Sequence, residues 1–522
     1  MTAATYLARE GLDVLLIEKN DVVGGLVNTF LRDGFYFDAG VRALEDAGII
    51  LPMLKDLGIE LDVVKSPVSI GIEDMILRIE DISSLSQYKG LLKKLYPESG
   101  SEIDAVLKII RRIMKHMNVL YGIENPVFKD LKKDYAFIFR TLLPWMPKFL
   151  WTIGKINRMQ TPVEDFLATV VKNVSLRDMI SQHFFKATPT FFAMSYFSLY
   201  LDYFYPKGGV GKLSEAVFAR YREFGGKIIT NSMVKSVSPA RKTVIDDKGI
   251  DHGYKNLIWA ADLKTLYRIA DVQDMPAEVK ARFMDAKTRM LDNKGGESVF
   301  SLFLQVNEPL DSFGSIATGH FFYTPSRQGL GQIHRGELRD LLNRFQEIGK
   351  EEILAWLDRF ISLNTFEISI PGLKDSDLSS PGKTGLIISF LADYELFEKV
   401  REAGWLEEFV SGIEKRVIKV ISNSVYPMLK DKIISCLSFS PLSVHDRIAS
   451  SEGAIVGWMF QEDMPVVNRI QIADRSVLTP LPSVYQAGQW AYSPAGVPMS
   501  ILTGKLAANR VVKASKSRNS SS

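Results

Sequence analysis

The N-terminal stretch Thr2–Gly40, TAATYLAREGLDVLLIEKNDVVGGLVNTFLRDGFYFDAG, decides the fold class. Its first part has four small or apolar residues at the spacing of one helical face: Ala4, Leu7, Ala8 and Gly11. Residues 12–17 then predict a buried parallel strand that ends at Glu18, and a loop leads to Gly24 and Gly25. This order of helix, strand, carboxylate and glycine turn is that of the second half of a βαβ nucleotide-binding unit.

Glu18 is the candidate ligand-binding carboxylate of this unit. A carboxylate at the end of the second strand accepts hydrogen bonds only, so it can hold the neighbouring hydroxyls of a ribose. A lone glutamate at a strand end is more often a solvated charge. The helix before it and the glycines after it favour the binding interpretation here.

The same stretch resembles the FAD-binding start of the phytoene desaturase, carotenoid isomerase and retinol saturase-like flavoproteins, a branch of the amine oxidase superfamily. The family pattern AxxLAxxGxxVxxxExxxxxGG is followed there by a segment like RDGFxFDxG, which residues 32–40 match closely. The resemblance implies FAD as the cofactor. Glu18 would bind the adenosine ribose, and the backbone turn at Gly24 and Gly25 would pass close to the diphosphate. Gly40 is the fourth cofactor-binding residue that this segment implies.

The family also places a strand and a GxGxxG turn before this helix, whereas the printed chain begins where that turn would end. The turn supplies backbone N–H groups and a helix N-terminus to the diphosphate. The chain as printed is therefore expected to bind FAD weakly or not at all. Two explanations stay open: a start codon assigned too late, which we favour, and a true loss of the dinucleotide site.

Three later segments repeat the resemblance in family order. Residues 205–237 resemble the central flavin-domain segment, where a valine backbone meets the adenine, and Val234 has that position. Residues 440–458 resemble a stretch of carotenoid isomerases and retinol saturases. Residues 484–508 resemble the C-terminal flavin motif, and this implies five further cofactor-binding residues: Gly488, Gln489, Gly496, Val497 and Pro498. Many relatives have an acidic residue where Gln489 stands, so its side-chain contact is the least secure of the five.

The predicted fold class is α/β. It comprises a Rossmann-like FAD-binding domain of the two-dinucleotide-binding-domain flavoprotein type and a discontinuous α+β substrate domain with a helical part suited to membrane association. The FAD-binding domain is assigned residues 1–65, 205–295 and 430–513, with its first strand absent; the substrate domain is assigned 66–204 and 296–429, and a disordered tail 514–522.

Two segments bear on the substrate. Aromatic residues crowd residues 184–204, as in the lining of a tunnel for an apolar polyene or polyisoprenoid, although each could equally be a core residue. Residues 135–155 mix aromatic and basic side chains around two prolines, which suits a membrane surface or, equally, an internal helix pair. No apolar run is long enough to span a bilayer and no signal peptide is apparent. A cytoplasmic protein, peripheral on the membrane if 135–155 contacts lipid, is predicted.

The resemblance implies hydride exchange with the flavin that desaturates, saturates or isomerises a carotenoid-like or retinoid-like compound. No second dinucleotide fingerprint is present, so an external electron acceptor or donor is expected. No catalytic residue can be assigned. Two alternatives stay open: an amine-oxidase-like enzyme acting on a small polar substrate, and a non-catalytic remnant if the missing phosphate loop is genuine.

The amino-acid composition argues against several other classes of protein. With 64 Lys and Arg against 61 Asp and Glu in 522 residues, the chain lacks the positive charge typical of nucleic-acid binders. The single cysteine, Cys436, cannot form an internal disulfide, and the six histidines show no metal-ligand spacing. We therefore expect a reducing compartment, no metal and no nucleic-acid partner.

Overall fold

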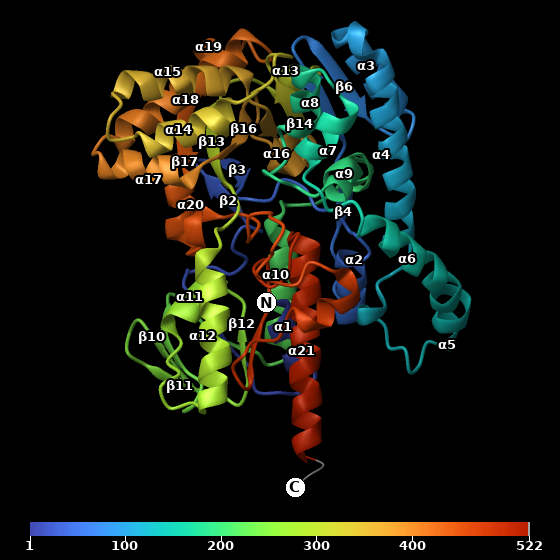
Figure 1. Cartoon of the computed structure of the whole chain (residues 1–522), viewed down its shortest axis with the longest axis vertical. Helices are drawn as coiled ribbons and strands as arrows, with labels where there is room; N and C mark the ends of the chain where they lie inside the picture. The colour runs from blue at the N-terminus through green and yellow to red at the C-terminus, as the bar shows by residue number, and fades with distance from the viewer. Residues whose placement is uncertain (520–522) are drawn as a thin grey trace.

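The computed structural model describes residues 1–519, and a seven-stranded mixed sheet organises its upper half (Figure 1). Only β14 and β5 pair in parallel; the other neighbours are antiparallel. The strands across the sheet are β17 (Ile433–Phe439), β13 (Ser298–Val306), β16 (Thr384–Ala392), β15 (Phe366–Ser369), β14 (His320–Thr324), β5 (Val68–Ile72) and β6 (Met75–Ile79).

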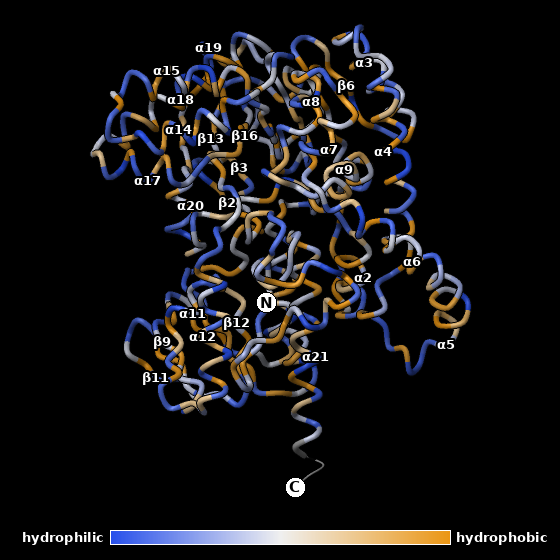
Figure 2. The backbone as a smooth tube through the Cα atoms, in the orientation of Figure 1, coloured by the Kyte–Doolittle hydropathy of each residue, from blue (hydrophilic) through white to orange (hydrophobic). Residues whose placement is uncertain are grey.

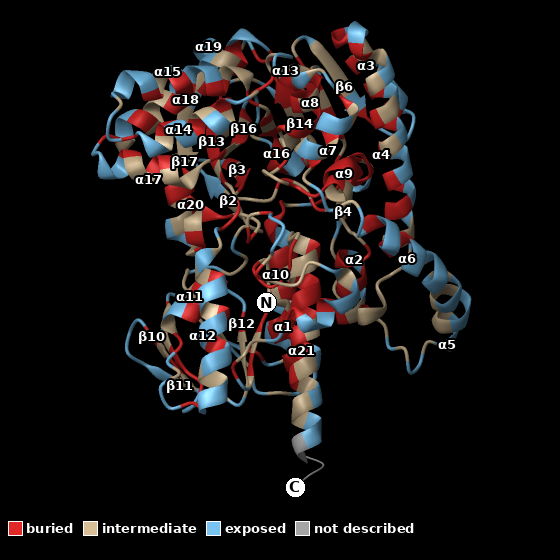
Figure 3. Ribbon diagram, viewed as in Figure 1, coloured by how far each residue is buried: buried red, intermediate tan, exposed pale blue. Residues whose placement is uncertain are grey.

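Helices cover one face of this sheet and bury its apolar side chains (Figure 3). The longest of them, α18 (Leu406–Asn423), buries one stripe at helical spacing: Phe409, Ile413, Val417 and Ile421. The others in this layer are α13 (Leu310–Gly314), α14 (Leu338–Asn343), α15 (Lys350–Leu363), α17 (Tyr394–Glu402) and α19 (Leu429–Lys432). They enclose the largest apolar core of the molecule, so this half folds around a sheet-and-helix layer.

A second group of helices packs beside β5 and β6. Its longest helix is α4 (Gly100–Leu120), one face of which buries Val106, Ile110, Ile113 and Met117. The group also contains α3 (Ser84–Leu95), α7 (Val163–Val170), α8 (Val174–Ser181) and α9 (Thr190–Asp202). A projecting segment continues from α4 and comprises α5 (Tyr135–Phe137), a π-helix (Ile138–Leu142) and α6 (Leu143–Ile156).

The lower half is built around three helices that lie side by side: α1 (Thr2–Arg9), α10 (Gly211–Glu223) and α21 (Val497–Asn519) (Figure 1). Two parallel strand pairs accompany them, β1 (Leu15–Ile17) with β8 (Lys227–Ile229) and β12 (Leu257–Trp259) with β18 (Val484–Gln486). The prediction of a buried strand over 12–17 is wrong in part. The strand covers only 15–17 and Leu15 is 42% exposed, because within residues 1–519 β1 pairs on one edge alone.

Smaller elements complete the chain. They are the antiparallel strands β9 (Val234–Ser238), β10 (Thr243–Asp246) and β11 (Asp251–Gly253), the hairpin β2 (Thr29–Arg32) and β3 (Phe35–Asp38), the pair β4 (Val63–Lys65) and β7 (Phe204–Pro206), and the helices α2 (Ile50–Leu57), α11 (Leu263–Ile269), α12 (Ala277–Asp292), α16 (Pro371–Lys374) and α20 (Pro441–Ile448).

The strand pairing bears on the proposed domain boundaries. The pair β4 and β7 lies where the chain crosses between the two halves, close to the boundaries at 65 and 205. By contrast, β17 hydrogen-bonds to β13 and so belongs to the seven-stranded sheet, although the boundary at 430 assigns it elsewhere. The segment assigned as a tail from 514 continues α21 as far as Asn519, and residues 520–522 lie outside the described part. Within residues 1–519, no helix has the length and hydrophobicity that crossing a bilayer requires.

Candidate functional site

Asp38 anchors the N-terminal segment to the loop before α10. Its fully buried carboxylate accepts hydrogen bonds from Thr29 Oγ1 (2.8 Å), the Tyr205 hydroxyl (2.8 Å) and the Val210 N–H (3.2 Å). These donors come from β2, β7 and the loop after β7, so one carboxylate joins segments about 170 residues apart in the chain. The RDGFxFDxG-like segment therefore holds the nearby glycine loop in place.

Gly24 and Gly40 lie where two parts of the chain pack closely against each other. A methyl group added to Gly24 would lie 2.7 Å from Ser214 Oγ, and one added to Gly40 would lie 2.6 Å from the Leu26 carbonyl oxygen. Both distances are far inside van der Waals contact. These two predicted cofactor-binding glycines thus allow the chain to approach itself closely.

Gly25, Gly488 and Gly496 are less crowded. At Gly25 (φ +57°) an added methyl group would meet no atom within 4 Å, and at Gly488 (φ +91°) the nearest atom is the Ala260 carbonyl oxygen, 3.6 Å away. At Gly496 the nearest atoms are Pro498 Cδ at 3.8 Å and Glu45 Oε1 at 3.9 Å. A ligand could approach the backbone at all three positions because no atom lies closer than ordinary van der Waals contact.

The start of α21 brings the C-terminal motif together. Val497 and Pro498 lie in the first turn of this 23-residue helix, whose N-terminus favours negatively charged or carbonyl oxygens. The Gly488 N–H donates to Thr503 Oγ1 (3.0 Å), which fastens the glycine turn to the helix. Gln489 follows this turn and is partly buried.

Glu18 lies just after β1, as predicted from the sequence. Its Oε1 accepts the Asn20 N–H (2.9 Å), and its Oε2 accepts no hydrogen bond from the described residues. The Glu18 carbonyl oxygen accepts the Ser232 N–H (3.0 Å), two residues before Val234. The fold thus brings the predicted ribose-binding and adenine-binding positions side by side.

Four ionisable side chains lie close to α9. Burial raises the pKa of Glu45 to about 7, lowers that of His183 to about 4 and raises that of Tyr196. The fourth, Glu367, keeps 33% of its side-chain surface accessible, and the other three also remain partly accessible.

The sheet face toward α9 is unusually polar. His320 Nε2 lies 2.9 Å from Glu367 Oε1, and the His320 ring stacks on Tyr203 with ring centroids 5.4 Å apart. Lys374 Nζ donates to the Arg42 carbonyl oxygen (2.6 Å), and burial lowers its pKa to about 8. Burial also lowers the pKa of His320. This charged cluster lies at the face of the sheet that contacts Tyr203, the residue that follows α9.

Together these features fit FAD. The three uncrowded glycines allow close backbone contacts, the free Glu18 oxygen can accept ribose hydroxyls, and the α21 N-terminus suits flavin oxygens. Within residues 1–519, no group of three or more His, Cys, Asp or Glu side chains is arranged to hold a metal ion.

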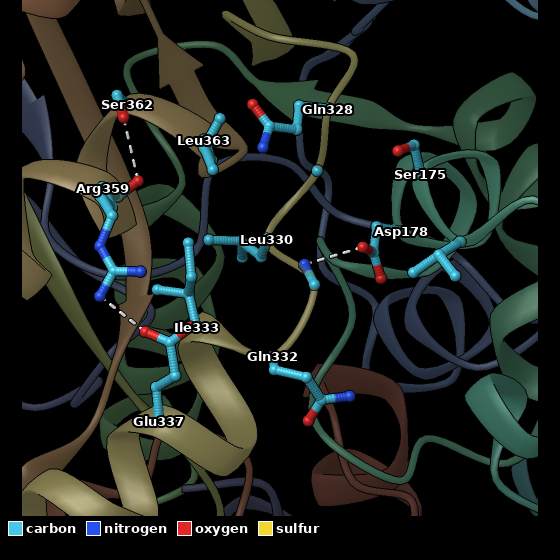
Figure 4. A pocket seen from close by; sticks show the side chains of 13 residues that line it. Ser175, Asp178, Gln328, Leu330, Gln332, Ile333, Glu337, Arg359, Ser362 and Leu363 are labelled. Carbon is cyan, nitrogen blue, oxygen red and sulfur yellow. Dashed lines mark hydrogen bonds and ion pairs between the residues drawn. The ribbon is translucent and has the colours of Figure 1, made fainter.

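A separate surface cavity of about 500 Å³ lies between α8 and the loop 328–333 (Figure 4). There the Asp178 carboxylate accepts the Gly331 N–H (2.8 Å), and Arg359 pairs with Glu337 (2.7 Å). None of the predicted cofactor-binding residues lines this cavity. It is therefore not the site that the sequence motifs indicate.

Sequence reasoning missed Glu45, His320 and Glu367. Glu45 is brought to Gly496 only by tertiary packing, so no local pattern could have singled it out. His320 and Glu367 lie on neighbouring antiparallel strands, in β14 and β15. Knowledge of the strand pairing, which one sequence does not contain, would have been needed to join them.

Comparison with known proteins is consistent with this geometry. The family model described as "Flavin containing amine oxidoreductase" matches residues 1–327. All-trans-retinol 13,14-reductase of Danio rerio is 23% identical over 544 residues, covering 94% of this chain and 80% of that protein. An inactive all-trans-retinol 13,14-reductase of the same organism is 22% identical over 98% of this chain and 84% of its own length. Phytoene desaturase of Fusarium fujikuroi is 21% identical over 99% of this chain and 88% of its own length.

Solved structures share the fold. An oxidoreductase from Methanosarcina mazei superposes with a TM-score of 0.57 at 13% identity and covers 98% of this chain and 97% of its own. Putrescine oxidase, in its wild-type form bound to putrescine, superposes with a TM-score of 0.56 at 14% identity, covering 98% and 96%. At these identities the likeness establishes the fold alone.

Proposed function

Since the chain belongs to the flavin containing amine oxidoreductase family and is an FAD-dependent oxidoreductase, we propose that its substrate is an apolar polyene or polyisoprenoid. The retinol reductases and the phytoene desaturase among its relatives support this substrate class. The reaction is then a desaturation, saturation or isomerisation, with an external electron acceptor or donor.

A row of aromatic rings along α9 supports the proposal most directly. Successive ring centroids lie 5.5 Å apart from Phe192 to Tyr196, 5.8 Å from Tyr196 to Tyr200 and 6.0 Å from Tyr200 to Tyr203. At 1.5 Å per residue this part of the chain extends over about 16 Å. A long apolar molecule can pack against such a row, whereas a small polar substrate needs only a compact pocket.

The cofactor-binding residues have distinct proposed roles. Gly25, Gly488 and Gly496 would let the backbone approach FAD, and Glu18 would accept its ribose hydroxyls. Gln489, Val497 and Pro498 would contact it at the start of α21, and Val234 would do so at β9. Bound FAD supplies a hydride acceptor or donor. The protein's task is to hold a substrate C–H or C=C bond against it and to exclude water.

Incubation with candidate substrates tests the proposal. The FAD-loaded protein, chemically reduced or left oxidised, is mixed with retinoids, carotenoids and diamines, and products are separated by chromatography. We expect a change in a double bond of the polyene. A Tyr196→Glu variant should lose this activity because a charge would enter the aromatic row. Turnover of an amine instead would establish the amine-oxidase-like alternative. No turnover of any compound would favour the non-catalytic remnant.

We also propose that residues 135–156 rest on a membrane surface. This segment projects from the side of the molecule (Figure 1) and is rich in apolar residues (Figure 2). Several large apolar side chains on it are 40–66% exposed: Tyr135, Phe139, Leu143, Met146, Leu150 and Trp151. It contains Arg140, Lys148 and Lys155 and no acidic residue. Exposed apolar area combined with positive charge suits a surface of anionic lipid.

Flotation with lipid vesicles tests this surface. The protein should float with vesicles containing anionic lipid and less with neutral ones. A Phe139→Ser/Leu150→Ser double variant should lose binding, whereas Ile82→Ser, which changes an equally exposed side chain (61%) elsewhere, should keep it. Equal flotation of the two variants would refute a role of this segment.

A further inference from the structure

Glu45 occupies a position that no motif explains. It lies between β3 and α2, and its Oε1 is 3.9 Å from the methyl position of Gly496, a glycine proposed to face the flavin. No described residue donates a hydrogen bond to its carboxyl group. Glu45 keeps part of its surface accessible, so a molecule bound beside Gly496 could reach its carboxyl group.

Three tyrosines lie close enough to Glu45 to sense its charge. Burial is the main cause that raises the pKa of Tyr121, at the end of α4, and those of Tyr196 and Tyr203, in or after α9, and the charge of Glu45 raises each of them further. No cation is among the groups that shift its own pKa, for which burial is the only cause. Glu45 therefore lies beside the proposed flavin position at Gly496 and within electrostatic reach of the aromatic row.

We propose that Glu45 exchanges the proton that accompanies hydride transfer between the flavin and the substrate. This inference rests on the proposed function and names the acid of that reaction. In reduction of a C=C bond, the hydride and its electron pair come from reduced FAD and form one C–H bond. The Glu45 O–H bond breaks, its proton forms the second C–H bond, and the carboxylate regains a proton from solvent. Desaturation runs in reverse, with Glu45 accepting the proton.

Other ionisable groups nearby are less suited to this task. Burial raises the pKa of Tyr196 and Tyr203 above the ordinary tyrosine value, so both hold their protons at neutral pH. His183, whose pKa burial lowers to about 4, is neutral there and has no acidic proton to give. Although burial acts to raise the pKa of Glu367, the hydrogen bond from His320 dominates together with nearby charges, and that carboxylate stays ionised. A carboxyl group that titrates near pH 7, as burial makes Glu45, suits proton transfer in both directions.

Two measurements on Glu45→Gln test the inference, with Glu124→Gln as the matched control. Glu124 is a surface residue that pairs with Lys55 and Lys129. Infrared spectra of the chain recorded across pH should show a protonated carboxyl band that disappears near pH 7, is absent in Glu45→Gln and persists in the control. This readout requires neither cofactor nor substrate. Absence of such a band in the unaltered chain would overturn the inference.

The second measurement is a single turnover of a polyene by the protein loaded with reduced FAD. The unaltered rate should fall as pH rises above about 7. Glu45→Gln should be slower by roughly 10²–10⁴-fold, without that pH dependence, and should keep the unaltered circular dichroism spectrum. An unchanged rate and pH profile in Glu45→Gln would refute the role of Glu45 and leave the proposed function standing. An unaltered protein that converts no polyene would refute the proposed function, and the inference with it.

Discussion

Replacement of Asp38 by alanine should strongly destabilise the protein. The carboxylate is fully buried and accepts three hydrogen bonds, from Thr29, Tyr205 and Val210. The alanine variant leaves these three donors buried without an acceptor, and each such group costs about 1–3 kcal/mol. The three groups together would cost about 3–9 kcal/mol, and because the 3.2 Å bond from Val210 is the longest and weakest, we expect a total in the lower half of that range, about 4–6 kcal/mol.

A loss of that size is a large part of the free energy of unfolding of an ordinary folded domain, which is roughly 5–15 kcal/mol. Urea unfolding followed by tryptophan fluorescence should show a lower midpoint. Limited proteolysis should cleave the loop 207–210 earlier, since this loop depends on Asp38. The control is Asp13→Ala, which removes an exposed carboxylate (82%) paired with Lys227 and should change stability by less than about 1 kcal/mol. An Asp38→Ala midpoint equal to that of Asp13→Ala would show that the buried hydrogen bonds do not anchor the segment.

Three further predictions follow from the site. Gly24→Ala should destabilise the fold, because its methyl group would collide with Ser214 and the Val27 carbonyl oxygen, and thermal unfolding would show it. Gly25→Ala should cost only about 1 kcal/mol for its positive φ yet weaken FAD binding measured by fluorescence titration; equal flavin affinity would contradict the proposed contact. Glu45→Gln should change the pH dependence of stability. The folded-state pKa of about 7 lies above the ordinary 4.5, so the contribution of Glu45 is present below about pH 4.5 and lost as pH rises through 7. The variant should match the unaltered protein at pH 4 and exceed it by about 3 kcal/mol above pH 7, and parallel unfolding curves across pH would contradict this.

Local sequence patterns were sufficient for several elements. The apolar face of α4, the helix α10 ending before Gly225 and Gly226, and the strand β13 all follow from residue periodicity and glycine punctuation. The order of motifs along the chain was also sufficient to indicate the family. These features depend on neighbours within a few residues, which a sequence displays directly.

Burial and strand pairing did not follow from local sequence patterns. Leu15 reads as a core strand residue, yet it is 42% exposed because β1 has one partner strand in the described chain. β17 reads as part of the C-terminal flavin segment, yet its backbone hydrogen bonds place it beside β13. Apolar composition predicts that a residue can be buried, whereas the partner that buries it comes from a distant part of the chain.

The sequence by itself determined the family, the cofactor class and the set of glycines. Only the tertiary structure separated Gly24 and Gly40, where a methyl group would collide with protein, from Gly25, Gly488 and Gly496, where it would not. It alone placed Glu45 beside the C-terminal motif. The physical reason is that a motif records which residue types a turn tolerates, whereas open space, burial and pKa arise from atoms that meet only after the whole chain has folded.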